Sequence, residues 1–191
     1  KRRPRYARKP QNLIFPEERR IRHRPKKVQE RKEFGHWECD LMIFERAQGQ
    51  ANVATLIERK SRFVVLFKNN DRQSKPIMDR LIKEMSPLPY YARRSLTFDR
   101  GFEFVSWRQL KLGLGIDAWF CDPSAPYQKG SVENMNKRVR RYLPRDTPVL
   151  SVSEPAIRLL IDRLNDTPRK CLGYRTPREV FREEIFNGPL H

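Results

Sequence analysis

The sequence contains few of the residues that build disulfide frameworks and zinc centres. Its 191 residues include three cysteines and three histidines, and no two cysteines form a CxxC pair. An odd number of isolated cysteines is typical of a reducing compartment and argues against both a disulfide framework and a zinc knuckle. A metal centre made of Cys and His is therefore not expected. The residues concerned are Cys39, Cys121, Cys171, His23, His36 and His191.

Long hydrophobic runs are also missing. No segment approaches the roughly 20 apolar residues that a helix needs to cross a bilayer, and no basic stretch followed by an apolar one resembles a signal peptide. We therefore expect a cytosolic protein without membrane attachment. The chain begins with Lys1 and its first methionine is Met42, so we expect it to be a fragment of a longer protein.

Acidic residues are outnumbered by basic ones. Forty-one Lys and Arg stand against 23 Asp and Glu, which gives a formal net charge of +18 and a pI near 10.4. Such an excess points to a polyanionic partner, and without a membrane segment nucleic acid is the stronger candidate. Residues 1–32 alone hold 14 Lys and Arg against three Glu, and their prolines break helices. We expect this segment to be an extended basic arm or linker, either solvated or lying along DNA phosphates.

Hydrophobic patterning in the rest of the chain shows two periods. Apolar residues that alternate along short segments predict strands, and apolar residues three or four positions apart predict helices. The order β-β-β-α-β-α-β-α-α-α predicts an α/β fold of the ribonuclease H-like class, with a mixed five-stranded sheet and helices on both faces. We expect residues 33–150 to form this core and residues 151–191 to add C-terminal helices that complete it. Strands are predicted at 36–44, 51–57, 62–67, 95–99 and 116–121, and helices at 74–85, 103–112, 131–143, 154–166 and from 176 onward.

Three acidic residues occupy positions suited to metal-assisted chemistry on a phosphodiester. Two divalent ions about 3.5–4 Å apart can activate the attacking and the leaving oxygen, and Mg²⁺ prefers carboxylate ligands. Asp40 lies in an apolar strand, where a charge is costly unless it is paired or metal-bound. Asp99 ends the fourth strand, which this topology places beside the first, and Glu133 lies near the start of a helix. We expect these three acids to be the catalytic residues and metal ligands.

Each of these acids also has a purely structural interpretation. Asp40 could accept a backbone N–H at a strand edge. Asp99 could form the turn that leads into Arg100 and Gly101. Glu133 could be a first-turn acid that the helix dipole favours. Their joint placement on two neighbouring strands and a helix favours the catalytic interpretation.

Four segments carry a resemblance to a known family. GHWECD, TFDRGFEF, FCDPSAPYQKGSVENMNKRVRRYLP and LNDTPRKCLGYRTPREVF together resemble bacterial insertion-sequence transposases of the IS-thirty family, members of the DDE superfamily with the retroviral integrases. The resemblance runs from about residue 35 to residue 181 and implies a retroviral integrase-like catalytic core. It also implies that Asp40, Asp99 and Glu133 hold two Mg²⁺ ions, for which Mn²⁺ would substitute.

The same resemblance implies an activity and its partners. Members of the family cut DNA at terminal inverted repeats and join the freed 3′-hydroxyl to target DNA, acting as multimers in the bacterial cytoplasm, on the nucleoid. We therefore expect a homo-oligomer, at least a dimer on DNA. We expect this chain to lack the family's N-terminal helix-turn-helix region, with residues 1–32 as the connecting segment. One departure is Arg100, because the superfamily often has Asn there; it would be a variant DNA contact or a residue that crowds the site.

Basic and polar residues around the helix at 131–143 are the candidates for DNA contact. Lys and Arg neutralise phosphates without reading sequence, although a basic helix face can also be simple solvated surface. Two other activities stay open: a ribonuclease H-like nuclease that cuts without joining, and a transposase-derived protein that binds DNA without catalysis. The candidate contacts are Tyr127, Gln128, Lys129, Lys137, Arg138, Arg140 and Arg141.

Overall fold

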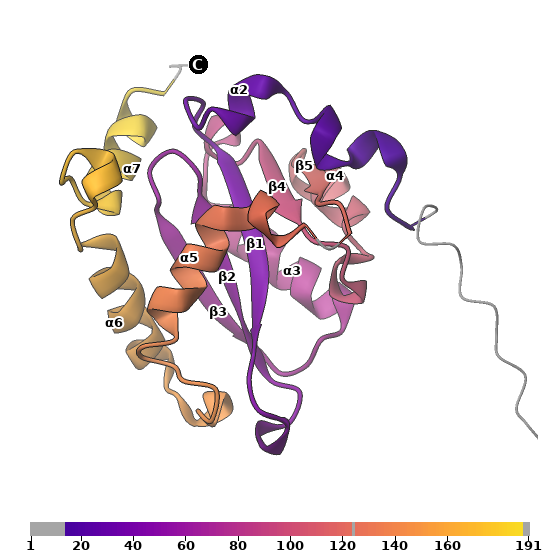
Figure 1. The fold of residues 1–191 in the computed structure, drawn as a ribbon, viewed down its shortest axis with the longest axis vertical. Helices are drawn as coiled ribbons and strands as arrows, with labels where there is room; N and C mark the ends of the chain where they lie inside the picture. Colours follow the sequence, from indigo (N-terminus) through magenta and orange to yellow (C-terminus); the bar gives the residue numbers. More distant parts are fainter. Residues whose placement is uncertain (1–13, 124, 189–191) are drawn as a thin grey trace, which may run out of the picture.

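A five-stranded sheet in the order β3-β2-β1-β4-β5 forms the centre of the computed structural model, which describes residues 14–123 and 125–188 (Figure 1). The first three strands are antiparallel neighbours, and β4 and β5 run parallel to β1. The mixed five-stranded sheet predicted from the sequence is thus confirmed. Its strands are β1 (His36–Ile43), β2 (Asn52–Glu58), β3 (Val64–Asn69), β4 (Ser95–Phe98) and β5 (Asp117–Phe120).

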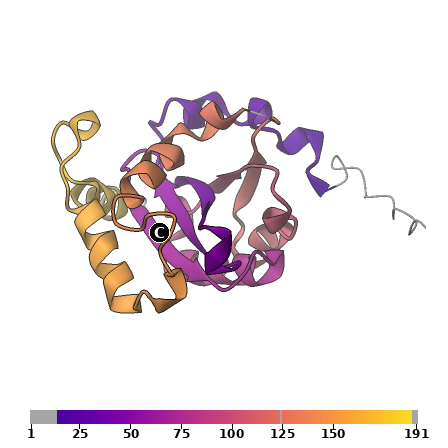
Figure 2. The same cartoon turned by 60° about the horizontal axis from the view of Figure 1, so that its bottom comes forward.

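Helices cover both faces of this sheet (Figures 1 and 2). On one face α3 and α4 pack their apolar side chains, such as Leu81 and Leu110, into one buried cluster. On the other face α5 and α6 contribute Val132 and Leu160 to a second cluster. The helices are α2 (Lys26–Gln29), α3 (Ser74–Met85), α4 (Arg108–Leu114), α5 (Gly130–Val139), α6 (Glu154–Asn165) and α7 (Pro177–Phe186).

The alternation of side chains along β1 decides which residues face α5. Successive side chains of a strand point to opposite faces of the sheet. Trp37 and Cys39 are buried in the cluster beneath α3. Glu38 and Asp40 point the other way, because both are bonded to residues in or next to α5. The pattern WECD therefore delivers two acids to the face that α5 covers.

The segment before β1 differs from the extended arm that its charge predicts. Residues 14–32 make short 3-10 turns and α2, which lie against one end of the sheet in Figure 1. Phe15, Ile21 and Val28 are buried, and Trp107 donates its indole N–H to the Ile14 carbonyl (2.9 Å). Apolar side chains scattered among the cations hold this stretch on the core. Residues 1–13 lie outside the described residues.

Helix boundaries differ from the prediction at two places. The helix predicted at 131–143 ends at Val139, and a tighter turn follows in which Tyr142 donates its backbone N–H to Val139. The stretch predicted as one helix at 103–112 is a 3-10 turn followed by α4. The capping residues predicted for the last helix are confirmed, because Thr176 and Glu179 cap each other at the start of α7. No helix within 14–123 and 125–188 has the length and apolar character to cross a membrane.

Candidate active site

Strand pairing brings the first two predicted acids together. The parallel register of β1 and β4 pairs His36 with Ser95 and Glu38 with Thr97. The same offset places Asp99, one residue beyond β4, beside Asp40. These two acids and Glu133 of α5 line one cavity of about 270 Å³, together with Cys121, Asp122, Ala125 and Lys129. We call this cavity the acidic cavity.

An ammonium group lies between the two strand acids. Lys129 donates to Oδ1 of Asp40 (2.8 Å) and to Oδ2 of Asp99 (3.0 Å), and only 5% of the residue is exposed. Burial alone would lower the pKa of Lys129, but the two carboxylates outweigh burial and raise it. Lys129 was expected among the DNA contacts; in this structure it bridges the acid pair and offsets part of its charge, a role that no sequence signal indicated.

Further hydrogen bonds fix the orientation of both carboxylates. Asn136, one turn beyond Glu133 on α5, donates its amide to Oδ2 of Asp40 (2.8 Å). Asp99 accepts the backbone N–H of Gly101 at Oδ1 (2.9 Å), so the turn-forming interpretation of Asp99 holds alongside its place in the cavity. Both acids are thus held by donors before any ligand is added.

A buried acid attaches α5 to the sheet. Glu38 is 1% exposed and accepts the backbone N–H of Val132 at Oε2 (2.9 Å), in the first turn of α5. Its other oxygen lies 3.2 Å from Nε of Arg59. Sequence reasoning overlooked Glu38, although an acid two positions from Asp40 in an apolar strand was the available signal. By fixing the start of α5, Glu38 sets the height at which Glu133 meets the strand acids.

The loop before α5 is tied to the cavity through Asp122. Gln128 accepts the backbone N–H of Asp122 (2.8 Å) and donates to its carboxylate (3.1 Å). Gln128 therefore holds this loop in place. Arg100 is not among the residues that line the acidic cavity, and its guanidinium lies 5.9 Å from the ring centre of Phe15.

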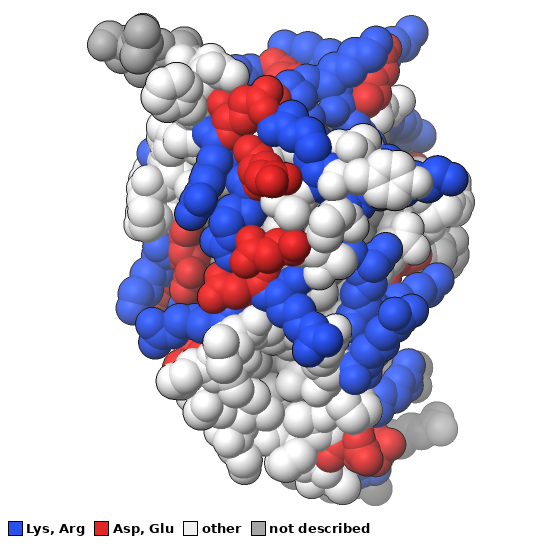
Figure 3. Space-filling model, turned by 90° about the vertical axis from the view of Figure 1, so that its left-hand side faces the viewer, with Lys and Arg blue, Asp and Glu red and all other residues white. Residues whose placement is uncertain are grey.

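The remaining candidates for DNA contact separate into two groups. Tyr127, Lys137, Arg138 and Arg141 are exposed. Arg140 instead lies over the ring of Phe44 (4.7 Å) and donates to the Ile43 carbonyl, which ties the end of α5 to β1. Lys and Arg cover much of the upper and right-hand part of the face drawn in Figure 3.

The donor set of the acidic cavity suits a hard divalent cation. Carboxylate oxygens are the ligands that Mg²⁺ prefers, and the position of Lys129 demonstrates that the Asp40–Asp99 pair accommodates positive charge. In the part of the chain that the structure describes, no three His, Cys, Asp or Glu side chains are gathered closely enough to hold a metal ion. Asp40 and Asp99 share an ammonium in this arrangement, so a metal between them would have to displace Lys129.

Comparisons with known proteins identify the family of the chain. The family model described as "Integrase core domain" matches residues 30–126. The chain is 32% identical over 165 residues to the transposase InsI of insertion sequence element IS30A from Escherichia coli, covering 86% of this chain and 42% of that protein. It is 35% identical over 167 residues to the transposase of IS1086 from Cupriavidus metallidurans, covering 87% of this chain and 49% of that protein. The chain thus spans less than half the length of these relatives.

A solved structure gives the same fold. The chain superposes with a TM-score of 0.62 and 16% identity on a chain of the simian T-cell lymphotropic virus intasome in complex with the PP2A regulatory subunit B56 gamma. The match covers 82% of this chain and 55% of that one. At this identity the likeness concerns the fold, which is the ribonuclease H-like arrangement predicted from the order of elements.

Proposed function

Because the chain belongs to the integrase core domain family, we propose that it is the catalytic core of a DNA transposase that cuts element ends and joins the freed 3′-hydroxyl to target DNA. The observation that carries this proposal is the meeting of Asp40, Asp99 and Glu133 in one cavity. These acids come from β1, the end of β4 and α5, and the cavity that they share supports the proposal. Similarity to insertion-sequence transposases supports the choice of DNA as substrate.

In this proposal the three acids hold two Mg²⁺ ions, or Mn²⁺ in their place. When bound, such ions stabilise the attacking and leaving oxygens of the phosphodiester. Asn136 and the backbone N–H of Gly101 keep one oxygen of Asp40 and one of Asp99 oriented. Lys129 holds the pair together by charge, and its ammonium would have to leave this position for a metal ion to bind between the two acids.

The partners in this proposal are the terminal inverted repeats of an element and its target DNA, in the bacterial cytoplasm. Tyr127, Lys137, Arg138 and Arg141 are exposed around α5 and would contact phosphates there. We also propose that the protein acts as a homo-oligomer, at least a dimer, because both ends of an element must be cut and joined to the same target DNA. A single subunit that completes strand transfer would contradict this part.

A branched DNA tests the proposed chemistry without knowledge of the repeat sequence. The branch copies the joined product, and by microscopic reversibility the same site should release the joined strand and reseal the target. Product should form with Mg²⁺ or Mn²⁺ and disappear in Asp40→Asn, Asp99→Asn and Glu133→Gln. Several kcal/mol of lost metal stabilisation correspond to roughly a thousandfold lower rate. Asp79→Asn, an exposed acid of α3, is the matched control.

Two other outcomes would replace the proposal. Cutting without resealing, lost in the same three variants, would identify a ribonuclease H-like nuclease. DNA binding without cutting or resealing under either metal would identify a protein that only binds DNA, and would draw attention to Arg100.

A further inference from the structure

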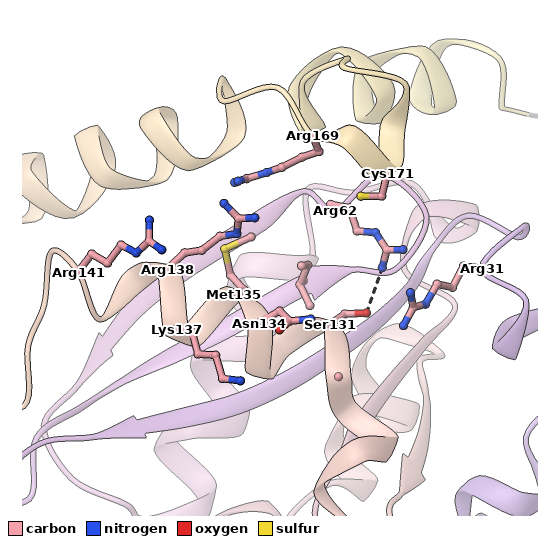
Figure 4. A pocket seen from close by; sticks show the side chains of 12 residues that line it. Arg31, Arg62, Ser131, Asn134, Met135, Lys137, Arg138, Arg141, Arg169 and Cys171 are labelled. Carbon is pink, nitrogen blue, oxygen red and sulfur yellow. Dashed lines mark hydrogen bonds between the residues drawn. The ribbon is translucent and has the colours of Figure 1, made fainter.

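A second cavity lies on the other side of α5 from the acidic cavity. It has a volume of about 510 Å³ and lies between α5, the β2–β3 turn and the loop between α6 and α7. Figure 4 shows guanidinium groups reaching it from four separate segments of the chain. We call it the arginine cavity, and its guanidiniums belong to Arg31, Arg62, Arg138, Arg141 and Arg169.

Among the residues that the structure describes, the cations of this cavity have no acidic partners. No Asp or Glu is among the described residues that line it. Throughout residues 14–123 and 125–188, none of its five arginines forms an ion pair with a carboxylate. Elsewhere the protein does pair its arginines, as with Arg178, which contacts both Asp162 and Asp166. The lack of acids therefore belongs to this cavity and is not a general result of the positive net charge.

Several of these arginines are held in place at an energetic cost. Arg62 donates to the hydroxyl of Ser131 (3.0 Å), and its buried Nε has no hydrogen-bond partner. Arg169 is buried and donates to the Leu164 carbonyl (2.8 Å). Burial and the neighbouring charge of Arg138 lower the pKa of Arg169. Such crowding of like charges destabilises the protein unless an anion enters.

Arg31 shares this cost. Burial and the charge of Arg62 lower its pKa. Both residues have left-handed backbone, with φ of 58° and 63°, a conformation that is uncommon for residues other than glycine. The fold thus maintains two strained positions that each present a guanidinium to the same cavity.

We propose that the arginine cavity binds backbone phosphates of DNA, as a second contact on the opposite side of α5 from the acids. This inference rests on the proposed function, which makes DNA the substrate. Guanidinium groups recognise phosphate oxygens in pairs of hydrogen bonds. The five arginines and Lys137 carry six positive charges, which exceed what one free phosphate neutralises, so a chain of phosphates matches the cavity better than a single anion. The lining offers no aromatic ring for a base to stack on, which favours contact with the backbone.

Salt-dependent DNA binding tests the phosphate contacts directly. The chain would be titrated with labelled duplex in EDTA at several salt concentrations, as wild type and as Arg138→Gln with Arg141→Gln. Each lost phosphate contact should reduce the slope of log K against log salt by about 0.9. The control is Arg158→Gln with Arg182→Gln, which removes the same two charges from exposed positions of α6 and α7 outside the cavity. Variants that bind DNA like the control would overturn the proposal.

Cys171 supplies a local report from the rim of the cavity. It is the exposed cysteine of the three, whereas Cys39 and Cys121 are buried. Bound DNA should slow alkylation of Cys171 by at least a few fold, and Arg62→Gln should abolish this protection. Equal rates with and without DNA would overturn the proposal, as would protection by inorganic phosphate but not by DNA. Thermal unfolding of each variant verifies that it is folded.

These measurements separate the two proposals. DNA that protects Cys171 without any metal-dependent cutting or resealing would support the arginine cavity and remove the proposed function. Cutting and resealing by a protein whose Cys171 stays unprotected would do the reverse.

Discussion

The two sides of α5 differ in how their charges are balanced. In the acidic cavity, Asp40 and Asp99 share the ammonium of Lys129, and Asn136 donates to Asp40. In the arginine cavity, five guanidiniums come together without any carboxylate. One helix therefore separates a set of anions that an internal lysine partly compensates from a set of cations without such a partner.

This difference indicates what each side requires from outside. A cation bound between Asp40 and Asp99 would displace the ammonium of Lys129, so binding there would be an exchange. An anion that enters the arginine cavity relieves repulsion that the protein otherwise carries, so binding there is an addition.

Glu38→Gln should disturb both cavities, because Glu38 anchors α5 to β1. Removing one partner of a buried ion pair costs roughly 3–5 kcal/mol, and here it leaves Arg59 charged and buried. Urea unfolding measures the loss. Glu30→Gln, an exposed acid of the N-terminal segment, is the control. Adding Arg59→Met should recover part of the loss, and strictly additive effects of the two substitutions would contradict the pairing.

Lys129→Met should affect the acidic cavity alone. The two carboxylates lose their shared cation, but they remain 24% and 43% exposed, so we expect a loss of about 1–2 kcal/mol. For a chain of this size that lowers the melting temperature by roughly 2–8 °C. Mg²⁺ should raise the melting temperature of this variant by more than it raises that of wild type. The control is Lys83→Met. If Mg²⁺ raised the melting temperature of wild type and Lys83→Met equally but did not raise that of Lys129→Met, the proposed exchange would be contradicted.

Inorganic phosphate should stabilise the protein through the arginine cavity. An anion at about ten times its Kd stabilises by about 1.4 kcal/mol, or roughly 3–6 °C in melting temperature for this size. Phosphate and chloride would be compared at equal ionic strength. The stabilisation by phosphate beyond that by chloride should vanish in Arg62→Gln and persist in Arg158→Gln. The same excess in both variants would reveal a general salt effect instead.

Lowering the pH should decrease the free energy of unfolding through His36, a group outside both cavities. Its ring nitrogens contact Ser95 (2.7 Å) and Glu33 (3.0 Å). Burial lowers its pKa from the usual 6.5, against the opposing effect of Glu33. The unfolded chain therefore takes up a proton first as pH falls below 6.5, and stability declines there by at most about 1.4 kcal/mol per pH unit. His36→Gln should remove this slope, and an unchanged slope would assign it to another group.

The fold was largely predictable because its signals are local. Alternating apolar residues marked the strands, and Thr176, Pro177 and Glu179 marked the start of α7. The packing of residues 14–32 on the core was not predictable. Phe15 and Ile21 are isolated apolar residues in a basic stretch, and a sequence pattern does not reveal where such residues pack. The predicted acids occupy one cavity because strand register fixed two of them.

Side-chain partners across long sequence distances were beyond sequence reasoning. Lys129 lies 89 residues from Asp40 and 30 from Asp99, and its basic charge alone suggested phosphate instead. The arginine cavity draws on four separate segments, so no motif describes it. Only the folded chain brings Arg62 and Arg169 to the same cavity as Arg138.

The most direct test of the division across α5 is a titration of resealing rate against branched DNA concentration, with Mg²⁺, for three proteins. They are wild type, Asp99→Asn, and Arg138→Gln with Arg141→Gln. The expected result is no product from Asp99→Asn at any DNA concentration, and a wild-type plateau from the arginine variant reached only at higher DNA concentration. Product from Asp99→Asn at the wild-type plateau, or an arginine variant whose half-maximal DNA concentration equals that of wild type, would contradict the account.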